Sequence, residues 1–403
     1  MTDTSTRPSR GRRLLRVAAV GATTVALLAS GAAVASAATT TDGFNPDPTR
    51  LLDTRFNLPD HPKGQVETFT QVTLPDSVPQ DGSALLSVTV VNPGTQGYIK
   101  VYPDGTAVPS TSDVNFVKGP TWAQEVMVSP GTAGRVDLLV GGNSAAIDIV
   151  VDVVGSFPKA SYTSLAPAQR VFDTRSPAVG TTAGPKGTGQ YLVRLPTGEN
   201  GVPAGAQAVA VTLTQAGASG TGYISAQSTS VVSGTSTVNY GRGTIASNLV
   251  WVKPTSDGRF VLAVTGAPTN LIVDVKGYSM SDAVKATDPA RLADSRSGRG
   301  GISGPQFGTV NVPLPSSAPE GASFALLNVT ATGSANPGWI ASYKADAGEL
   351  QTSNINFAKG QTIGGFILVP IANGRASFFV GYSSTQVVVD IAGYISNAAP
   401  PAN

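Results

Sequence analysis

The sequence predicts an all-β protein of three tandem β-sandwich, jelly-roll-like domains, each of about 115 residues, after a signal peptide. Three observations predict this fold class. One long segment recurs three times along the 403 residues, and runs of alternating or β-branched residues are short and broken by turn residues. Charged residues make up only 13% of the chain, which has 46 Gly and 29 Pro. Such a composition favours many short strands joined by tight turns.

An opening hexapeptide and a closing segment define the repeat. The hexapeptide aspartates are 120 and 121 residues apart, so insertions and deletions have hardly changed the period. The opening hexapeptides are RLLDTR at Arg50–Arg55, RVFDTR at Arg170–Arg175 and RLADSR at Arg291–Arg296. The closing segments are VVDVVGSF at Val150–Phe157, IVDVKGY at Ile272–Tyr278 and VVDIAGY at Val388–Tyr394.

Two further landmarks keep their order inside every copy. A GYI or GWI tripeptide precedes a T-S-x-x-N-aromatic segment. The tripeptides begin at Gly97, Gly222 and Gly338, and the segments are Thr111–Phe116, Thr235–Tyr240 and Thr352–Phe357. About eight strands fit into each copy, which is the size of a double-sheet sandwich. The alternative is a propeller with two blades per copy, which would need a half-period similarity that the copies lack.

These landmarks set the predicted domain limits. Short connectors of about ten residues separate the copies and restrict how far neighbouring domains can move apart. The predicted parts are a signal peptide at 1–37, β domains at 45–157, 165–278 and 286–394, and a disordered tail at 395–403.

The first 37 residues have the features of an export signal. Five arginines precede a mild apolar run from Val17 to Ala35, and Ala35-Ser36-Ala37 is a small-residue cleavage site. The alternative is an uncleaved membrane anchor, but the run is rich in Ala, Gly and Thr, which makes it a poor bilayer span. We therefore expect a secreted protein that is extracellular or associated with the cell envelope. The choice between the Sec and twin-arginine routes stays open.

Charge and cysteine content exclude several classes of partner. Removal of the signal takes away five Arg and one Asp, which leaves 22 basic and 24 acidic residues. No basic stripe remains to follow phosphates, so we expect no nucleic-acid partner. The chain has no Cys, so burial and backbone pairing must hold each domain without disulfides. We also expect no membrane span in the mature chain.

The hexapeptide is interpreted as a strand that clasps the domain. Strict alternation would place Leu51, Asp53 and Arg55 on one face. The closing segment is apolar on both faces around its aspartate, and a buried carboxylate needs a partner. We therefore predict structural ion pairs Asp152–Arg55, Asp274–Arg175 and Asp390–Arg296. The alternative interpretation makes Asp53 and Arg55 a ligand-binding or catalytic dyad, but a neighbouring guanidinium lowers a carboxyl pKa, which is unfavourable for a general acid.

The catalytic inventory is small. The chain has one histidine, His61, which lies in a loop of the first copy only. A Ser-His-Asp arrangement or a metal-histidine site would need more partners than this residue has. We therefore expect no enzyme activity, no cofactor and no metal site. A glycoside hydrolase with paired carboxylates remains the less favoured alternative.

Aromatic residues give the candidate ligand-binding positions. After the GYI glycine, Tyr98, Lys100 and Tyr102 would share one strand face, while Ile99, Ile224 and Ile340 would face the core. Aromatic rings beside polar neighbours on an outer face can stack on sugars, whereas edge packing is the alternative role. Trp122 and Trp251 align with apolar residues of the other copies and are expected in cores. The candidate binding residues are Tyr98, Tyr102, Tyr223, Trp339 and Tyr343.

The opening RLLDTR, the mid-domain GYI and TSxxNF, and the closing VDVxGY together resemble a repeat module of secreted and cell-envelope proteins of actinobacteria. The resemblance covers residues 45–394 and implies an accessory, non-catalytic unit. We therefore expect an exported protein that binds an envelope or extracellular polysaccharide through three similar β domains. The alternative is a structural, self-assembling or protein-binding surface protein. Three weak sites on short linkers would gain avidity through their effective concentration.

Overall fold

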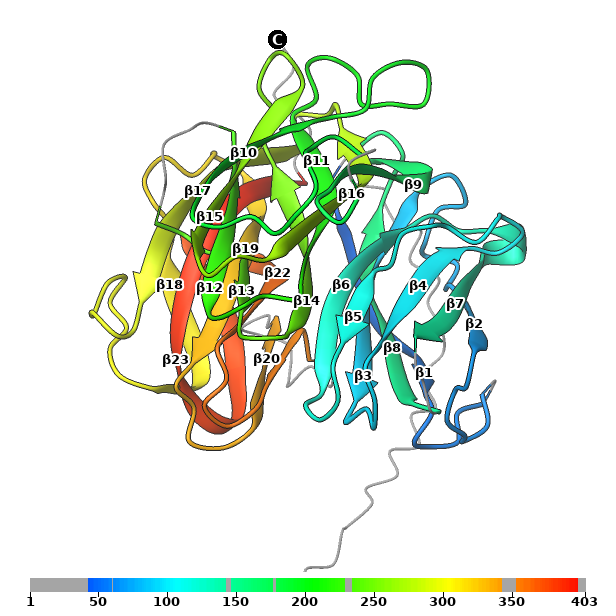
Figure 1. Cartoon of the computed structure of the whole chain (residues 1–403), viewed down its shortest axis with the longest axis horizontal. Helices are drawn as coiled ribbons and strands as arrows, with labels where there is room; N and C mark the ends of the chain where they lie inside the picture. Colours follow the sequence, from blue (N-terminus) through cyan, green and yellow to red (C-terminus); the bar gives the residue numbers. More distant parts are fainter. Residues whose placement is uncertain are drawn as a thin grey trace, which may run out of the picture. The chain divides into compact units, whose positions relative to one another are not determined.

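The computed structural model describes residues 43–59, 61–142, 146–176, 179–228, 234–342 and 353–397. Within these residues the chain forms strands and one short 3-10 turn at Thr132–Gly134, and no α-helix (Figure 1). The predicted all-β class is confirmed. None of the described segments forms a helix long and apolar enough to cross a membrane.

The strands fall into three groups that coincide with the three sequence repeats. Repeat 1 contains β1 Asn45–Asp53, β2 Phe69–Thr73, β3 Ser83–Val91, β4 Gly97–Pro103, β5 Val114–Phe116, β6 Trp122–Val128, β7 Arg135–Gly142 and β8 Asp148–Phe157. Repeat 2 contains β9 Thr163–Asp173, β10 Gly189–Arg194, β11 Ala208–Ala216, β12 Gly222–Gln227, β13 Val238–Tyr240, β14 Ile245–Val252, β15 Arg259–Gly266 and β16 Asn270–Ser279. Repeat 3 contains β17 Val284–Asp294, β18 Gln306–Pro313, β19 Ala322–Thr332, β20 Gly338–Ser342, β21 Ile355–Phe357, β22 Ile363–Ala372 and β23 Arg375–Ser396.

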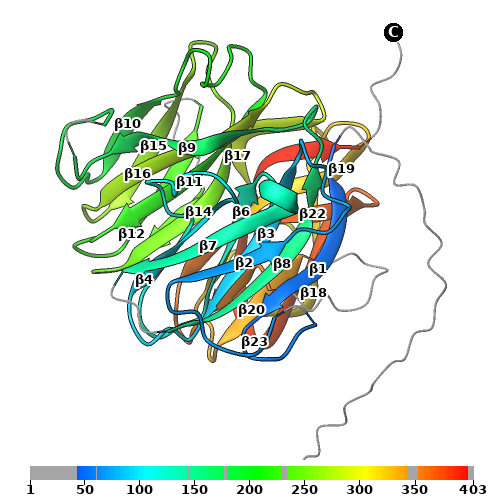
Figure 2. The ribbon, with the colours of Figure 1, turned by 90° about the vertical axis from the view of Figure 1, so that its right-hand side faces the viewer.

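Each of the first two repeats is a sandwich of two four-stranded antiparallel sheets. In repeat 1 the sheet orders are β1-β8-β3-β6 and β2-β7-β4-β5 (Figure 2). Repeat 2 has the same orders, β9-β16-β11-β14 and β10-β15-β12-β13. Eight strands that alternate between two sheets in this way form a jelly roll, so the predicted sandwich class is confirmed.

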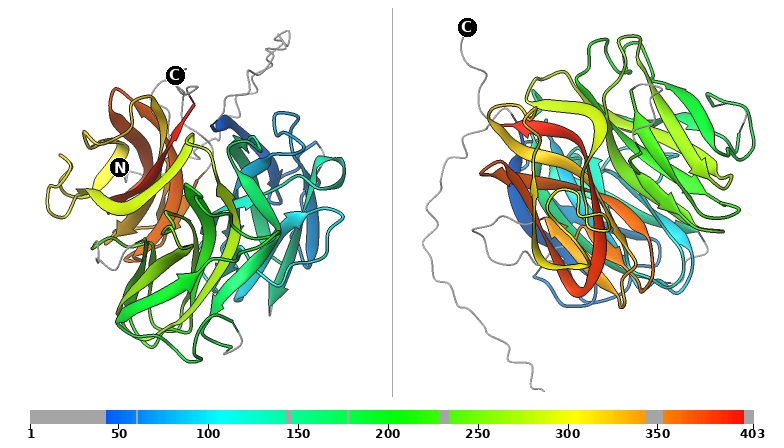
Figure 3. Two further views of the ribbon diagram at one scale, coloured as in Figure 1. Left: turned by 90° about the horizontal axis from the view of Figure 1, so that it is seen from above. Right: turned by 90° about the vertical axis from the view of Figure 1, so that its left-hand side faces the viewer.

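Repeat 3 keeps this arrangement but runs its last two strands together. Strand β23 has 22 residues, pairs first with β18 and β20, and then with β17 and β19 (Figure 3, orange to red). Tyr382 lies between these two parts with a φ of 63°. This backbone conformation is rare for a bulky side chain, and it occurs where β23 passes from one sheet to the other.

Strand alternation places the sandwich cores. Ile99, Ile224 and Ile340 are completely buried, so the prediction that they face the core is confirmed. Trp122 and Trp251 are also buried, as expected. Strand β3 is buried on both faces: Leu86 belongs to the core of its own sandwich, whereas Leu85 belongs to a second apolar cluster. A strand that is covered on both sides reads as a continuous apolar run.

This second cluster contains residues of all three repeats. Its centre is aromatic: Phe157 of repeat 1 lies 5.9 Å from Trp251 of repeat 2, and Phe44 lies 5.3 Å from Phe324 of repeat 3, between ring centroids. Leu85, Ala210 and Leu326 enter the cluster from equivalent strand positions. The three sandwiches therefore share an apolar centre, and the described residues belong to one compact unit.

The two ends of the described chain are joined. Asn397 accepts a hydrogen bond from the Phe44 amide at 2.9 Å and donates one to the Phe44 carbonyl at 2.7 Å. Strand β23 continues to Ser396, so the prediction of a disordered tail from residue 395 is wrong for 395–397. The sequence pattern ended at Tyr394 and gave no sign of this contact. The predicted signal peptide, 1–37, and the rest of the tail lie outside the described residues.

Candidate functional site

The opening hexapeptide forms a bulged strand edge rather than a regular strand. In repeat 1, Arg50 lies opposite Asp152 and Leu52 lies opposite Val151, so Leu51 is an extra residue. The same irregularity follows the first arginine in repeats 2 and 3. A bulge reverses the alternation of side chains along the strand. Arg50 and Asp53 therefore share a face. The predicted strict alternation, which would place Arg50 on the face opposite to Asp53, is wrong.

The bulge changes which arginine meets the buried aspartate. Arg50 donates two hydrogen bonds to the Asp152 carboxylate, and Arg55 donates two to Asp53, at 2.8 and 2.7 Å. The predicted pairs Asp152–Arg55, Asp274–Arg175 and Asp390–Arg296 are therefore wrong, although every one of these residues takes part in an ion pair. The observed pairs are Arg50–Asp152, Arg170–Asp274, Arg291–Asp390, Arg55–Asp53, Arg175–Asp173 and Arg296–Asp294.

The two aspartates of each cluster differ in acidity. Burial raises the pKa of Asp152 more than the hydrogen bonds from Arg50 lower it. Burial also acts to raise the pKa of Asp53, but the hydrogen bonds and charge of Arg55, with the charge of Arg50, outweigh it, and the pKa lies below its ordinary value. Asp274 and Asp390 behave like Asp152, and Asp173 and Asp294 like Asp53. In each repeat, the two arginines and the aspartate of the hexapeptide and the aspartate of the closing strand therefore form a cluster of two guanidiniums and two carboxyls, called the hexapeptide cluster below.

The T-S-x-x-N-aromatic segment of each repeat is fixed by its third residue. Asp113, Thr237 and Asn354 each accept a hydrogen bond from the backbone of the neighbouring strand, at 2.8, 3.2 and 2.6 Å. The second polar side-chain atom, Oδ1 of Asp113 or Nδ2 of Asn354, binds a residue of the next repeat. Asp113 forms a buried ion pair with Lys276 at 2.5 Å, and Asn354 donates to Glu125.

These segments connect the repeats in a closed cycle. The segment of repeat 1 contacts repeat 2 where Asn115 meets Ser247 at 3.3 Å. The segment of repeat 2 contacts repeat 3, where the Ser236 amide donates to the buried carboxylate of Asp390 at 3.2 Å. The segment of repeat 3 returns to repeat 1, where Ser87 donates to the Ser353 carbonyl at 3.2 Å. Every hexapeptide cluster is thus adjacent to the segment of the preceding repeat.

Glu125 is an unusual group in the seam between repeats 3 and 1. It occupies the strand position of Leu249 and Phe366 in the other repeats. Burial raises the pKa of Glu125 to about 8, and the charge of Asp152 adds to this, although the hydrogen bond from Asn354 acts in the opposite direction. Its second oxygen, Oε2, has no hydrogen-bond partner in the described part of the chain. The neutral acid therefore predominates at pH 7.

The predicted aromatic stripe divides in the structure. Tyr98 and Trp339 lie over Gly141 and Gly381 of the adjacent strands, where a Cβ atom would meet their rings at 2.4 Å. Tyr223 lies opposite Thr265 instead, so its ring does not have a glycine below it. All three aromatic side chains are partly exposed.

The other two aromatic candidates have different outcomes. Tyr102 was predicted to share an exposed face with Tyr98, but it is 6% exposed, and burial, with the charges of Asp137 and Asp104, raises its pKa. The prediction of an exposed face is wrong for Tyr102, because β4 is covered on both faces near its end: Tyr102 and the preceding Val101 are both buried. Tyr343 lies outside the described residues.

An aromatic cleft of about 1410 Å³ lies between repeats 3 and 1. Repeat 3 contributes Trp339 and Phe379, whose ring centroids are 5.4 Å apart, and the exposed residues Phe307 and Tyr382. Repeat 1 contributes the hexapeptide cluster, and its Arg55 lies over the Phe56 ring at 5.4 Å. The cleft-lining members of that cluster are Arg50, Asp53, Arg55 and Asp152.

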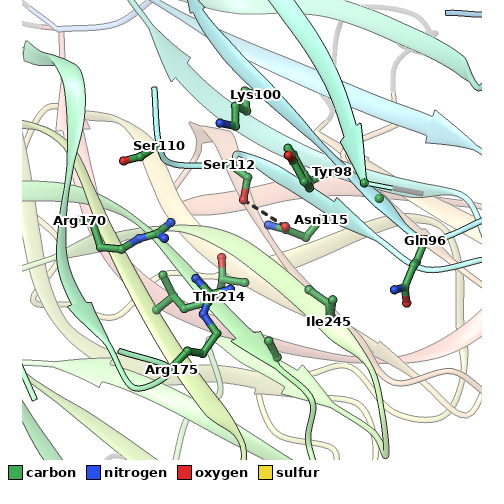
Figure 4. Close-up of a pocket in the computed structure, with 14 residues that line it drawn as sticks. Gln96, Tyr98, Lys100, Ser110, Ser112, Asn115, Arg170, Arg175, Thr214 and Ile245 are labelled. Carbon is green, nitrogen blue, oxygen red and sulfur yellow. Dashed lines mark hydrogen bonds between the residues drawn. The ribbon is translucent and has the colours of Figure 1, made fainter. Parts of the chain in front are cut away.

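A basic cleft of about 380 Å³ lies between repeats 1 and 2 (Figure 4). Repeat 1 contributes Tyr98 and Lys100 from β4, together with hydroxyl and amide groups of its T-S-x-x-N segment. Repeat 2 contributes Arg170 and Arg175 of its hexapeptide. The two clefts have the same plan: an aromatic residue after the GYI or GWI glycine of one repeat is combined with the hexapeptide cluster of the next.

Sequence reasoning identified the parts of this site but missed how they combine. Tyr98, Trp339 and the hexapeptides were singled out separately, whereas the structure brings them together across repeat boundaries. Phe56 and Phe307 were missed altogether. Their positions in the sequence could have indicated them. Phe56 directly follows an opening hexapeptide, and Phe307 lies in a turn-rich stretch with few other large apolar residues.

Comparisons with known proteins add little to this description. No family model and no curated protein matches the chain. Among solved structures, the protein described as "The Triple Jelly Roll Fold and Turret Assembly in an Archaeal Virus" matches with 12% identity and a TM-score of 0.24, over 88% of this chain and 91% of that one. Another, described as the atomic structure of Sulfolobus Turreted Icosahedral Virus, has 10% identity and a TM-score of 0.23, with the same coverage. These likenesses carry no argument about function.

Proposed function

We propose that this is an exported, non-catalytic protein that binds an envelope or extracellular polysaccharide in the clefts between its repeats. The observation that carries the proposal is the aromatic cleft, in which four aromatic side chains of repeat 3 face Phe56 and the charged cluster of repeat 1. Phe307 is 64% exposed and Tyr382 is 87% exposed, which is unusual for large apolar side chains of a folded chain.

The chemistry of this cleft fits a sugar polymer. The flat C–H faces of sugar rings pack on aromatic rings, while their hydroxyls hydrogen-bond to fixed polar groups. The guanidiniums of Arg50 and Arg55 and the carboxylate of Asp53 are held in place by one another, so they need little reorganisation on binding. The positive φ of Tyr382 at the cleft supports a functional role, because strained residues cluster at binding sites.

A second cleft of the same plan supports attachment at more than one point. Because the T-S-x-x-N segments link the repeats in a cycle, the clefts are presented by one compact unit rather than by independent domains. Sites held at fixed separation raise the effective concentration of the next segment of a polymer.

Hydrolysis is the less favoured role for the cleft carboxyls. Asp53 and Asp152 both line the aromatic cleft, but each is bound by guanidinium groups. The pKa of Asp53 lies below its ordinary value, which is the wrong direction for a general acid. The pKa of Asp152 is raised, but this residue is buried and Arg50 binds both of its carboxylate oxygens. No group of three metal-binding side chains occurs among the described residues.

A second candidate function is protein binding, which the exposed Phe307 and Tyr382 also favour. Aromatic residues are enriched at the centres of protein interfaces. The two candidates differ in the ligand that would occupy the same cleft.

The first test is a pull-down of residues 38–403 with insoluble cell-wall material and common polysaccharides, combined with analytical ultracentrifugation. We expect a monomer that is retained on a polysaccharide, and a loss of about tenfold in affinity when Trp339 is replaced by Ala. Phe69→Ala is the matched control, since Phe69 is 51% exposed outside the cleft lining. Equal binding by both variants, or an oligomer that holds no polymer, would contradict the proposal and favour assembly.

A further inference from the structure

The basic cleft contains more positive than negative charge. Lys100, Arg170 and Arg175 all line it, and Figure 4 shows Lys100 on one side and the two arginines on the other. Arg170 binds Asp274 at 2.8 Å and Arg175 binds Asp173 at 2.8 Å. Two carboxylates therefore balance two of the three cations.

Lys100 is the cation without a balancing acid. Its Nζ donates to the Pro109 carbonyl at 2.5 Å and lies 5.8 Å from the centroid of the Tyr98 ring. Both partners are uncharged. Within the described part of the chain, no carboxylate lies at salt-bridge distance from Lys100.

Arg175 is held so that one donor remains for a ligand, whereas Arg170 uses all three of its nitrogens on Asp274 and Asp173. Arg175 uses Nε and Nη2 to bind Asp173, and its Nη1 makes no hydrogen bond within the described residues. Its side chain is 47% exposed. The Ser110 hydroxyl lines the same cleft and adds an uncharged donor, whereas the Ser112 hydroxyl already donates to Asn115 at 3.1 Å. A rigid guanidinium with a free edge is suited to a carboxylate or phosphate.

The aromatic cleft lacks this charge excess. Ala341 takes the place of Lys100 in repeat 3, where it is buried. The two guanidiniums of Arg50 and Arg55 are matched by Asp53 and Asp152. The two clefts are therefore equipped for different parts of a polymer.

We propose that the basic cleft binds an acidic substituent, a carboxylate or a phosphate, of the glycan that the aromatic cleft holds. This inference rests on the proposed function. Tyr98 packs against the sugar ring, Lys100 neutralises its acid, and the Nη1 group of Arg175 donates a hydrogen bond to it. The bound polymer is thus an acidic polysaccharide.

The test compares matched polymers by isothermal titration calorimetry with residues 38–403. The carboxylate arm uses polygalacturonate and its methyl ester, and the phosphate arm uses phosphorylated dextran and plain dextran. We expect at least one acidic polymer to bind about tenfold more tightly than its neutral counterpart, with an affinity that falls as NaCl is added. Whichever arm shows the preference identifies the acid.

Lys100→Met removes the charge and keeps the length of the side chain. We expect this variant to lose the preference for the acidic polymer while its thermal unfolding midpoint stays the same. Lys118→Met is the matched control, because Lys118 is exposed in the same repeat and outside the cleft lining. A preference that survives in Lys100→Met, or equal binding of acidic and neutral polymers, would overturn the inference.

The two proposals fail in different ways. If neutral polymers bind and Trp339→Ala weakens them, while Lys100→Met changes nothing, the basic cleft has no role and the glycan-binding function stands. If the protein binds neither these four polymers nor cell-wall material, the proposed function fails, and the inference fails with it.

Discussion

Two seams of the molecule, one between repeats 1 and 2 and one between repeats 3 and 1, are built from the same segments. They bury different polar groups. In the first, Asp113 meets Lys276 at 2.5 Å, and the side chains are 2% and 7% exposed. In the second, Asn354 stands in place of Asp113 and donates to the buried Glu125. One seam therefore buries an ion pair and the other a single acid.

The difference shows two ways to place an acid in a dry interface. Asp113 lies beside the ammonium group of Lys276, and removal of either partner would leave the other buried without its counter-ion. Glu125 has an amide partner, which carries no charge, and burial makes the neutral acid the favoured form. We therefore expect the first seam to depend on its partner residue and the second to depend on pH.

The largest effect is expected when the ion pair is broken on one side. Lys276→Met leaves Asp113 buried without a counter-ion, which should lower the free energy of unfolding by about 3 to 5 kcal/mol. Urea denaturation at pH 7 measures this change. Adding Asp113→Asn to the variant removes the stranded charge and should recover most of the loss. A Lys276→Met protein as stable as wild type would show that the pair contributes nothing to the seam.

The next effect is a loss of stability with rising pH that originates in Glu125. Its folded-state pKa, about 8, lies above the ordinary value of 4.5, so the folded protein holds this proton more tightly than the unfolded chain. The contribution is fully present below pH 4.5 and is lost as the pH rises towards 8. It amounts to at most about 5 kcal/mol, and is lost in full only above pH 8, since each pKa unit corresponds to about 1.4 kcal/mol.

Urea denaturation between pH 4.5 and 9 tests this prediction. Glu125→Gln cannot ionise, so the stability difference between wild type and variant should change across this window in favour of the variant at high pH. Subtracting the two curves cancels the contributions of Asp274 and Asp390, whose raised pKa values act in the same direction. Glu67→Gln, at an exposed position, is the control. Parallel curves for Glu125→Gln and wild type would contradict the assignment.

The sandwich fold followed from the sequence because its signals are local. The repeat period, the turn residues and the alternation around Ile99 and Ile224 each depend on neighbours along the chain. They correctly placed the cores and the all-β class. The position of Trp251 was also predicted as buried, although its membership of a cluster shared by three repeats was not.

The clefts were not predicted because they arise between repeats. Nothing near Tyr98 in the sequence shows that Arg175, of the next repeat, lines the same cleft. One signal was present: the run from Ser83 to Val90 contains no charged residue, which is typical of a strand covered on both faces, and it is buried at every position. That pattern indicates a third layer against each sandwich, which in this protein is a neighbouring repeat.

The ion pairs were assigned to the wrong arginine for a different reason. A β-bulge inserts one residue without any required change in residue type, so Leu51 is indistinguishable from a regular strand residue in the sequence. The extra residue moved Arg50 to the face of Asp152, and Arg55 came to lie beyond the end of the strand, beside Asp53.

The smallest of the expected effects is the difference between these two arginines. Arg50→Ala leaves the buried Asp152 without its guanidinium and should cost about 3 kcal/mol of unfolding free energy. Arg55→Ala should cost only about 1 kcal/mol, because the Arg55 side chain is 40% exposed and Asp53 keeps its bond to Arg50 at 3.0 Å. Thermal and urea unfolding of the two variants at pH 7 measure the difference. Since the bulge recurs in repeat 2, Arg170→Ala and Arg175→Ala should repeat this order, whereas a larger loss for Arg55→Ala than for Arg50→Ala would restore the pairing expected from strict alternation.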